Sequence, residues 1–93
     1  MATYRPKGKI VLRRIGADRL LVPVSGDLAR ESCVFPLNET GEFIWSRLAR
    51  GVSVEVTAGA LSSEFDVELA EARNDCVEFA EELVRRGMLE VMT

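Results

Sequence analysis

Three short apolar segments, each followed by polar or turn-forming residues, occupy the first part of the chain. They are rich in branched aliphatic side chains and lie close together in the sequence, which is typical of neighbouring β-strands. Pro23 and Pro36 stand near the ends of the second and third segments, where proline is tolerated at irregular or edge positions. We therefore predict a three-stranded antiparallel meander. The segments are residues 9–15 (KIVLRRI), 19–24 (RLLVPV) and 33–37 (CVFPL).

From residue 38 onward the apolar positions recur with a helical period. We predict helices over residues 39–50, 54–65 and 67–86, followed by an extended tail at 88–91. Their expected N-caps are short polar side chains that accept hydrogen bonds from the free amides of a first turn, namely Asn38, Ser53 and Asp66. The third helix is the longest, and its apolar stripe is wide. That stripe comprises Leu69, Ala72, Cys76, Phe79 and Leu83, broadened by Val77, Ala80 and Val84.

The order of these elements predicts an α+β fold that resembles a winged helix-turn-helix, with a three-stranded antiparallel sheet followed by three helices. A chain of 93 residues forms one domain, so residues 1–93 are expected to share a single core. We expect Trp45 to anchor that core rather than to contact a ligand, because large aromatic side chains are mostly buried. The predicted core is Ile44, Trp45, Leu48, Leu61, Phe65, Val77, Ala80 and Val84.

The inventory of side chains argues against catalysis. The chain has no histidine, which is the commonest general base and metal ligand. Its two cysteines, Cys33 and Cys76, are too far apart in sequence for a CxxC motif, and no glycine-rich phosphate-binding motif is present. We predict no enzymatic activity, no metal and no cofactor. We expect both cysteines to be inert, buried side chains, while a redox role for them stays open.

Neither a membrane span nor a secretory signal is visible, so the chain is expected in the cytoplasm.

The distribution of charge along the chain argues against binding to nucleic acid. Residues 53–86 carry nine acidic and three basic side chains, and phosphate repels a recognition helix of that charge. The first thirty residues are basic, with seven basic and two acidic side chains, but a solvated strand face explains them more simply. We therefore predict no binding to nucleic acid or membrane.

Several blocks of the sequence together resemble the PqqD-like family, over roughly residues 9–91. The block L-N-E-T-G followed by I-W, in register with a closing R-R-G-M-L, is the most specific part of the likeness. The opening Pro-Val-Ser-Gly resembles free-standing members that accompany radical-SAM enzymes with an iron–sulfur-binding SPASM extension. The residues that carry the resemblance are 23–26, 35–41, 44–45, 51, 64–67 and 83–89.

The resemblance implies a peptide chaperone, also called a recognition element, of ribosomally made and post-translationally modified peptides. In such a protein the leader of a precursor peptide adds as a strand to the edge of the third β-strand, beside the third helix, and is presented to a radical-SAM enzyme. Here we expect an antiparallel strand along 33–37, with Phe79 and Leu83 as the pocket floor. The implied peptide-binding residues are Ser32, Cys33, Val34, Phe35, Pro36, Leu37, Asp75, Cys76, Phe79, Glu82, Leu83 and Arg86.

Several of the implied binding residues also fit other roles. Phe79 and Leu83 could belong to the core as readily as to a groove, and Arg86 could simply complement the end of its helix. Two departures from the family pattern are Thr57, where a larger aliphatic residue is usual, and Pro36, which lacks an amide hydrogen.

The competing function is a helix-turn-helix transcriptional regulator or a general protein-interaction domain. We expect a monomer or a weak homodimer.

Overall fold

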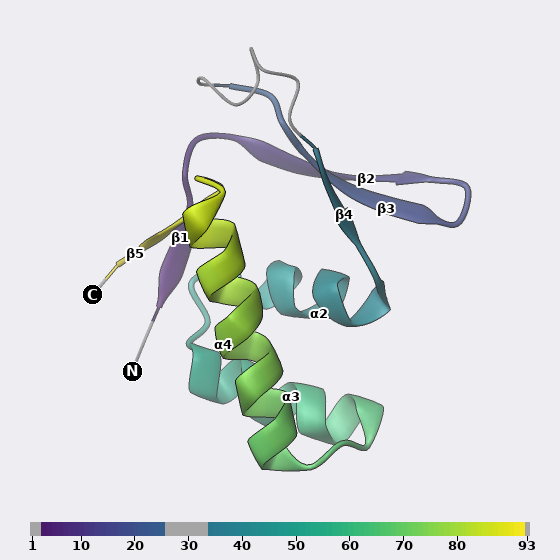
Figure 1. Cartoon of the computed structure of the whole chain (residues 1–93), viewed down its shortest axis with the longest axis vertical. Helices are drawn as coiled ribbons and strands as arrows, with labels where there is room; N and C mark the ends of the chain where they lie inside the picture. Colours follow the sequence, from purple (N-terminus) through teal and green to yellow (C-terminus); the bar gives the residue numbers. More distant parts are fainter. Residues whose placement is uncertain (1–2, 26–33, 93) are drawn as a thin grey trace.

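A computed structural model of the chain describes residues 3–25 and 34–92. Within these residues the predicted order is confirmed: a three-stranded antiparallel sheet is followed by three helices (Figure 1). Two short strands at the chain ends form a second sheet. The elements are β1 (Tyr4–Pro6), β2 (Ile10–Ile15), β3 (Asp18–Pro23), β4 (Phe35–Leu37), α2 (Glu39–Leu48), α3 (Val54–Phe65), α4 (Leu69–Arg85) and β5 (Leu89–Val91).

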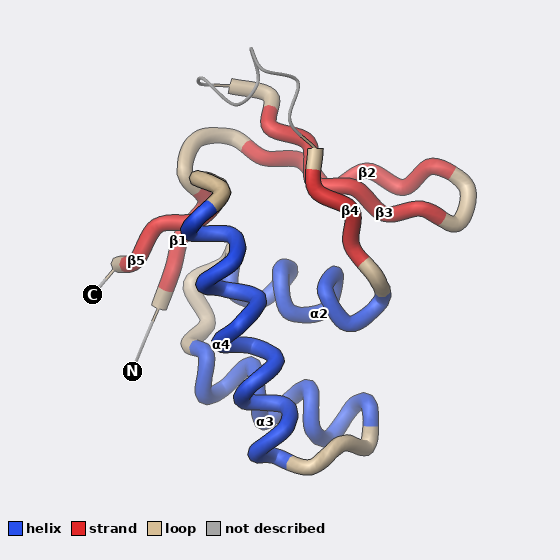
Figure 2. The backbone as a smooth tube through the Cα atoms, in the orientation of Figure 1, coloured by secondary structure: helices blue, strands red, loops and turns tan. Residues whose placement is uncertain are grey.

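Strands β2, β3 and β4 pair in that order, which leaves β4 at one edge of the sheet. The β2–β3 hairpin turns at Gly16, whose φ of 62° suits glycine, and it projects to one side of α4 (Figure 2). Strand β4 pairs with β3 through Leu37 opposite Arg19 and Phe35 opposite Leu21. Because Leu21 is fully buried, this pairing ties β4 to the core.

The second sheet joins the two ends of the described chain. The predicted extended tail is strand β5, and it pairs antiparallel with β1, with Tyr4 opposite Val91. Strand β1 was not expected, because a three-residue segment ending in proline carries no periodic signal. The two-stranded sheet of β1 and β5 also buries the ring of Tyr4, which is 8% exposed. Burial, followed by the nearby carboxylates of Glu81 and Glu55, raises the pKa of that phenol.

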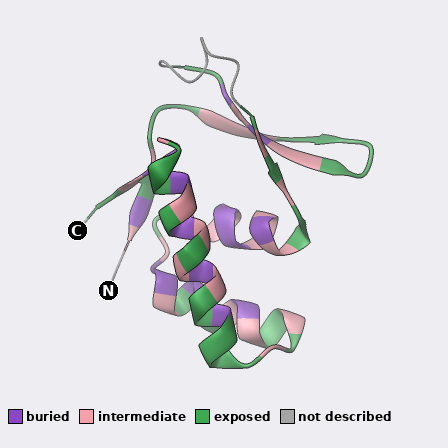
Figure 3. Cartoon of the chain, in the orientation of Figure 1, coloured by how far each residue is buried: buried purple, intermediate pink, exposed green. Residues whose placement is uncertain are grey.

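The core lies where the three helices meet the small sheet and β3 (Figure 3). Of the predicted core, Ile44, Trp45, Leu48, Leu61 and Ala80 are buried, as expected. Phe65 and Val77 are half-buried and pack against the edge of this cluster. The cluster is completed by residues that include Leu21, Val54, Ala58, Ala72, Cys76, Leu83, Met88 and Leu89.

Two positions of the predicted apolar stripe of α4 are exposed, so these predictions were wrong. Val84 is 36% exposed because it lies on the flank of α4, where it lines a shallow depression with Tyr4 and Val91. Leu69 is 58% exposed and is the first residue of α4. The stripe that packs is narrower than predicted, since Ala72, Cys76, Ala80 and Leu83 follow the spacing of a single helical face.

Two of the three predicted N-caps are confirmed. The side chain of Asn38 accepts a hydrogen bond from the amide of Gly41 at 2.7 Å, and that of Ser53 accepts one from the amide of Val56 at 3.2 Å. Asp66 does not begin α4 but ends α3 in a left-handed conformation, with φ at 54°, which aspartate tolerates better than most residues. Glu68 precedes α4 without a side-chain cap.

Among the helices that the structure describes, none combines the length and the apolar character that a membrane-spanning segment needs.

Candidate functional site

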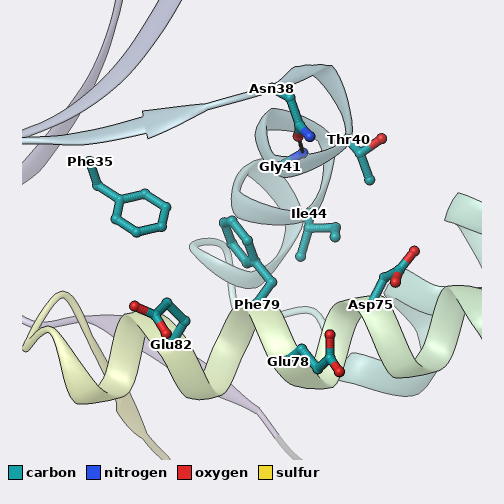
Figure 4. Close-up of a pocket in the computed structure, with 9 residues that line it drawn as sticks. All are labelled: Phe35, Asn38, Thr40, Gly41, Ile44, Asp75, Glu78, Phe79 and Glu82. Atoms are coloured by element: carbon teal, nitrogen blue, oxygen red, sulfur yellow. Dashed lines mark hydrogen bonds between the residues drawn. The ribbon is translucent and has the colours of Figure 1, made fainter.

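An open groove lies between β4, the first turn of α2 and the exposed side of α4 (Figure 4). Its volume is about 410 Å³. The groove exists because β4 is an edge strand that leads directly into α2, so that the free strand edge faces a helix instead of another strand. Its lining residues are Phe35, Asn38, Thr40, Gly41, Ile44, Asp75, Glu78, Phe79 and Glu82.

Two aromatic rings form the apolar part of the groove. The ring of Phe35 on β4 meets that of Phe79 on α4 edge-on, with centroids 6.4 Å apart and an angle of 80° between the planes. The guanidinium of Arg86 lies 4.9 Å from the centre of the Phe35 ring. Both rings are only half-buried, so they offer apolar surface to a partner while holding the strand and the helix together.

Gly41 permits the close approach of α2 to α4. A Cβ atom at this position would lie 3.2 Å from the Leu37 side chain and from the Asn38 side-chain oxygen, and 3.4 Å from the Phe79 ring. An added Cβ atom would therefore crowd the side chains of Leu37 and Asn38 and would touch the Phe79 ring at ordinary van der Waals distance. Gly41 belongs to a motif of the family resemblance but was assigned no role from the sequence, because this contact depends on the packing of α2 against α4.

The acidic side chains along α4 differ in their partners. Glu82 accepts hydrogen bonds from Arg85 at 2.5 Å and from Arg86 at 2.6 Å. These bonds, that from Arg85 most of all, lower the pKa of Glu82. Glu78 accepts a hydrogen bond from the side-chain amide nitrogen (Nδ2) of Asn74 at 3.3 Å. Among the described residues, neither Asp75 nor Glu78 has an ion pair, so negative charge on this wall of the groove is left uncompensated.

The structure brings together most of the predicted site residues that it describes. Phe35, Asp75, Phe79 and Glu82 line the groove, and Arg86 borders it through the ring of Phe35. Val34, Pro36 and Leu37 belong to β4 or directly precede it. Val34 and Pro36 are exposed, while Leu37 is half-buried. Ser32 and Cys33 lie outside the described residues, and so does any contact between Cys33 and Cys76.

Cys76 and Leu83 do not line the groove surface. Both are fully buried, on the face of α4 that packs into the core, which lies roughly 40–60° around the helix axis from Phe79. The predicted floor is therefore corrected: Phe79 lies there, with Phe35 in place of Leu83. Burial, with a smaller effect from Asp75, raises the pKa of the Cys76 thiol to about 11, so this thiol is held in its neutral form.

Other lining residues were not predicted from the sequence. Asn38 was assigned only as a helix cap and Ile44 only as core, and Thr40 and Glu78 were given no role in the site. Glu78 could have been found, because it stands four residues before Glu82 on the same side of a predicted helix. Among the described residues, no group of three or more His, Cys, Asp or Glu side chains is placed to hold a metal ion.

The basic surface of the β2–β3 hairpin is a separate region and is partly neutralised. Glu42 accepts hydrogen bonds from Arg14 Nε at 3.0 Å and from Arg19 Nε at 2.6 Å, and also pairs with Arg14 Nη2. These contacts lower the pKa of Glu42, with the hydrogen bond from Arg14 as the largest cause. The hairpin is thereby attached to the first turn of α2, and two of its arginines are less available to phosphate.

Comparison with known proteins gives one family and two similar structures. Residues 23–89 match the family model described as "Coenzyme PQQ synthesis protein D (PqqD)". A solved structure of "Lasso peptide synthetase B1 complexed with the leader peptide" is 27% identical to the chain, covers 96% of it and 99% of its own chain, and has a TM-score of 0.80. No curated protein matches the chain.

The second structure is "TbiB1 in Complex with the TbiA(beta) Leader Peptide". It is 23% identical, covers 92% of this chain and 94% of its own, and has a TM-score of 0.75. At that identity it shows likeness of fold alone.

Proposed function

Because the chain belongs to the PqqD family, we propose that it binds the leader segment of a ribosomally made precursor peptide and holds it for a modifying enzyme. The observation that carries this proposal is the open edge of β4 beside the aromatic groove of α4. The similar lasso peptide synthetase B1 was solved with a leader peptide, which supports the same class of ligand here. The chain itself is proposed to be non-catalytic.

The leader is proposed to add to β4 as an antiparallel strand. An edge strand presents backbone N–H and C=O groups without partners, and an extended peptide satisfies them while its alternate side chains enter pockets. Strand β4 is short, spanning Phe35–Leu37. Pro36 has no N–H to donate, so the ladder lacks one possible bond at this residue. We expect this gap to limit the length of the added strand and to fix its register.

Side-chain specificity is proposed to come from the helical wall of the groove. Every second residue of an added strand points to the same face of the sheet, and those that point toward α4 meet Phe79 and the ring of Phe35. An apolar leader side chain seated there removes two half-exposed rings from water. The Phe79 contact is therefore expected to be the principal source of affinity.

Two partner enzymes are consistent with this role. The opening Pro-Val-Ser-Gly motif favours a radical-SAM enzyme with a SPASM extension. Similarity to lasso peptide synthetase B1 over 96% of the chain favours the machinery of lasso peptide synthesis as a second candidate. Co-purification of the tagged protein with each candidate enzyme, in the presence and absence of leader peptide, distinguishes the two. The true partner is expected to be retained at a stoichiometry close to one.

The proposal is tested by calorimetric titration at low and high salt. One titrant is a synthetic leader peptide, taken from a short precursor reading frame if the neighbouring genes include one, and the other is a DNA duplex. Strand addition depends mainly on backbone hydrogen bonds and apolar contact, so leader affinity should change little with salt. Affinity that is found only for DNA, and that falls steeply with salt, would instead support the helix-turn-helix regulator.

A further inference from the structure

The groove is electrically asymmetric along its length. One end carries Asp75 and Glu78, neither of which has an ion pair among the described residues. At the other end the carboxylate of Glu82 is paired with Arg85 and Arg86, so its charge is compensated. Arg86 also borders the groove there through the ring of Phe35. In the close-up view Phe79 lies between Glu82 and Asp75, and Phe35 lies at the Glu82 end (Figure 4).

The direction of β4 relates this asymmetry to the direction of a bound peptide. Phe35, at the start of β4, lies beside Arg86 near the end of α4. Gly41, which follows β4, approaches Phe79 two turns further back along α4, and Thr40 and Asp75 lie at the same end of the groove in the close-up view. Strand β4 therefore runs against the direction of α4. A peptide added antiparallel to β4 would run from the acidic end of the groove to the basic end.

We infer that the groove selects a leader with a defined order of charges: a lysine or arginine two residues before the apolar side chain that contacts Phe79, and an aspartate or glutamate after it. This inference rests on the proposed function and specifies the ligand of the same site. A peptide in the opposite order would place its basic residue near Arg86 and its acidic residue near Asp75, and both contacts would be repulsive.

The two-residue spacing between the basic and the apolar side chain of the leader follows from the geometry of the added strand and of α4. Residues two apart on one face of a strand are separated by about 6.6 Å, and residues four apart on a helix by about 6 Å. An apolar side chain over Phe79 therefore brings the residue two positions earlier to the level of Asp75, four residues before Phe79 on α4. The same strand face reaches the level of Arg86 two to four residues after the apolar position.

The test is a selection from a displayed library of randomised twelve-residue peptides against the full chain. A parallel selection uses the double variant Asp75→Lys, Glu78→Lys. The control variant Glu64→Lys, Glu81→Lys makes the same change in net charge on exposed residues of α3 and α4 outside the groove. Selected peptides are then measured against Phe79→Ala to establish that they occupy the groove.

We expect the wild-type chain to enrich a basic residue two positions before an apolar one, and the groove variant to enrich an acidic residue there. A peptide selected by the wild type should bind the groove variant about tenfold more weakly, and the control variant with little change. Peptides that depend on Phe79 but show no charge order, or the reverse order, overturn the inference and leave the proposed function intact. If no selected peptide depends on Phe79, the proposed function fails together with it.

Discussion

The ring of Phe35 in β4 contacts the ring of Phe79 in α4 edge-on, with their centroids 6.4 Å apart. This contact joins the free edge of the sheet to the longest helix, and together the two rings are the apolar surface of the groove. A strand that adds to β4 must therefore pass over Phe79. The contact between the two rings places the proposed strand addition and the proposed side-chain recognition in one site.

Truncation of Phe79 is the first prediction. Phe79→Ala removes the side chain that we propose as the principal apolar contact with the leader, and affinity should fall about ten- to a thousandfold. The matched control is Phe43→Ala, which removes the partner of Phe65 in an edge-on pair with centroids 5.3 Å apart, outside the groove. Calorimetric titration with the synthetic leader measures both variants. Equal losses in the two variants would show that the effect is one of stability and not of binding.

Acid stability should depend on Glu42. Its pKa is lowered in the folded protein, chiefly by the hydrogen bond from Arg14. A carboxylate with a lowered pKa contributes stability that is fully present above its unfolded value, and that is lost as pH falls through the folded value. Glu42→Gln should lower the free energy of unfolding near pH 7 by on the order of 1 kcal/mol or less.

The effect of the same substitution should become smaller as the pH falls, because protonation of Glu42 removes its ion pairs with Arg14 and Arg19. Urea unfolding at pH 7 and at pH 3 measures both values. A difference between wild type and Glu42→Gln that is as large at the lower pH would contradict the assigned ion pairs.

Two helical glycines should respond differently to alanine. A methyl group added at Gly59 in α3 would have nothing within 4 Å, so Gly59→Ala should stabilise the protein by about 0.5–1 kcal/mol. At Gly41 the same methyl group would meet Leu37 and Asn38 at 3.2 Å. Gly41→Ala should therefore stabilise the protein less than Gly59→Ala does, or destabilise it, and it should weaken leader binding by shifting Leu37 of β4. Thermal melts and titrations of both variants check this, and weaker binding by Gly59→Ala would count against it.

Thr57 offers a stabilising substitution. It is fully buried in α3, and within the described part of the chain its hydroxyl oxygen has no hydrogen-bond partner. Thr57→Val keeps the shape and removes the polar atom, so it should raise the free energy of unfolding by about 1 kcal/mol. Thr57→Ser is the control, because it retains the hydroxyl and loses a methyl group, and it should destabilise. Denaturant unfolding in which valine proves no more stable than threonine would contradict this assignment.

Much of the fold could be predicted from the sequence, because its signals are local. The apolar runs and the helical period indicated the order of strands and helices, and the caps at Asn38 and Ser53 followed from short polar side chains before a helical pattern. Asp66 was misplaced by the same rule, since a short polar side chain also suits the left-handed end of a preceding helix. Strand β1 was missed because it exists only by pairing with β5, more than eighty residues away.

The candidate site could be predicted only in outline. The resemblance placed it at β4 and α4, and Phe35, Phe79 and Glu82 do line the groove. An apolar stripe as wide as the one predicted for α4 does not reveal which of its members face the core, so the burial of Cys76 and Leu83 could not be predicted from it. The contribution of Gly41 depends on how closely α2 approaches α4, which no local pattern encodes.

Addition of a leader peptide to β4 beside α4 can be observed directly by titrating isotope-labelled protein with the synthetic leader and following backbone amide shifts by NMR. We predict that the shifted amides include Val34, Phe35 and Leu37, and those of α4 around Phe79 and Glu82. Shifts confined to Arg13, Arg14 and Arg19, with β4 and α4 unchanged, would contradict strand addition and would place the binding surface on the β2–β3 hairpin.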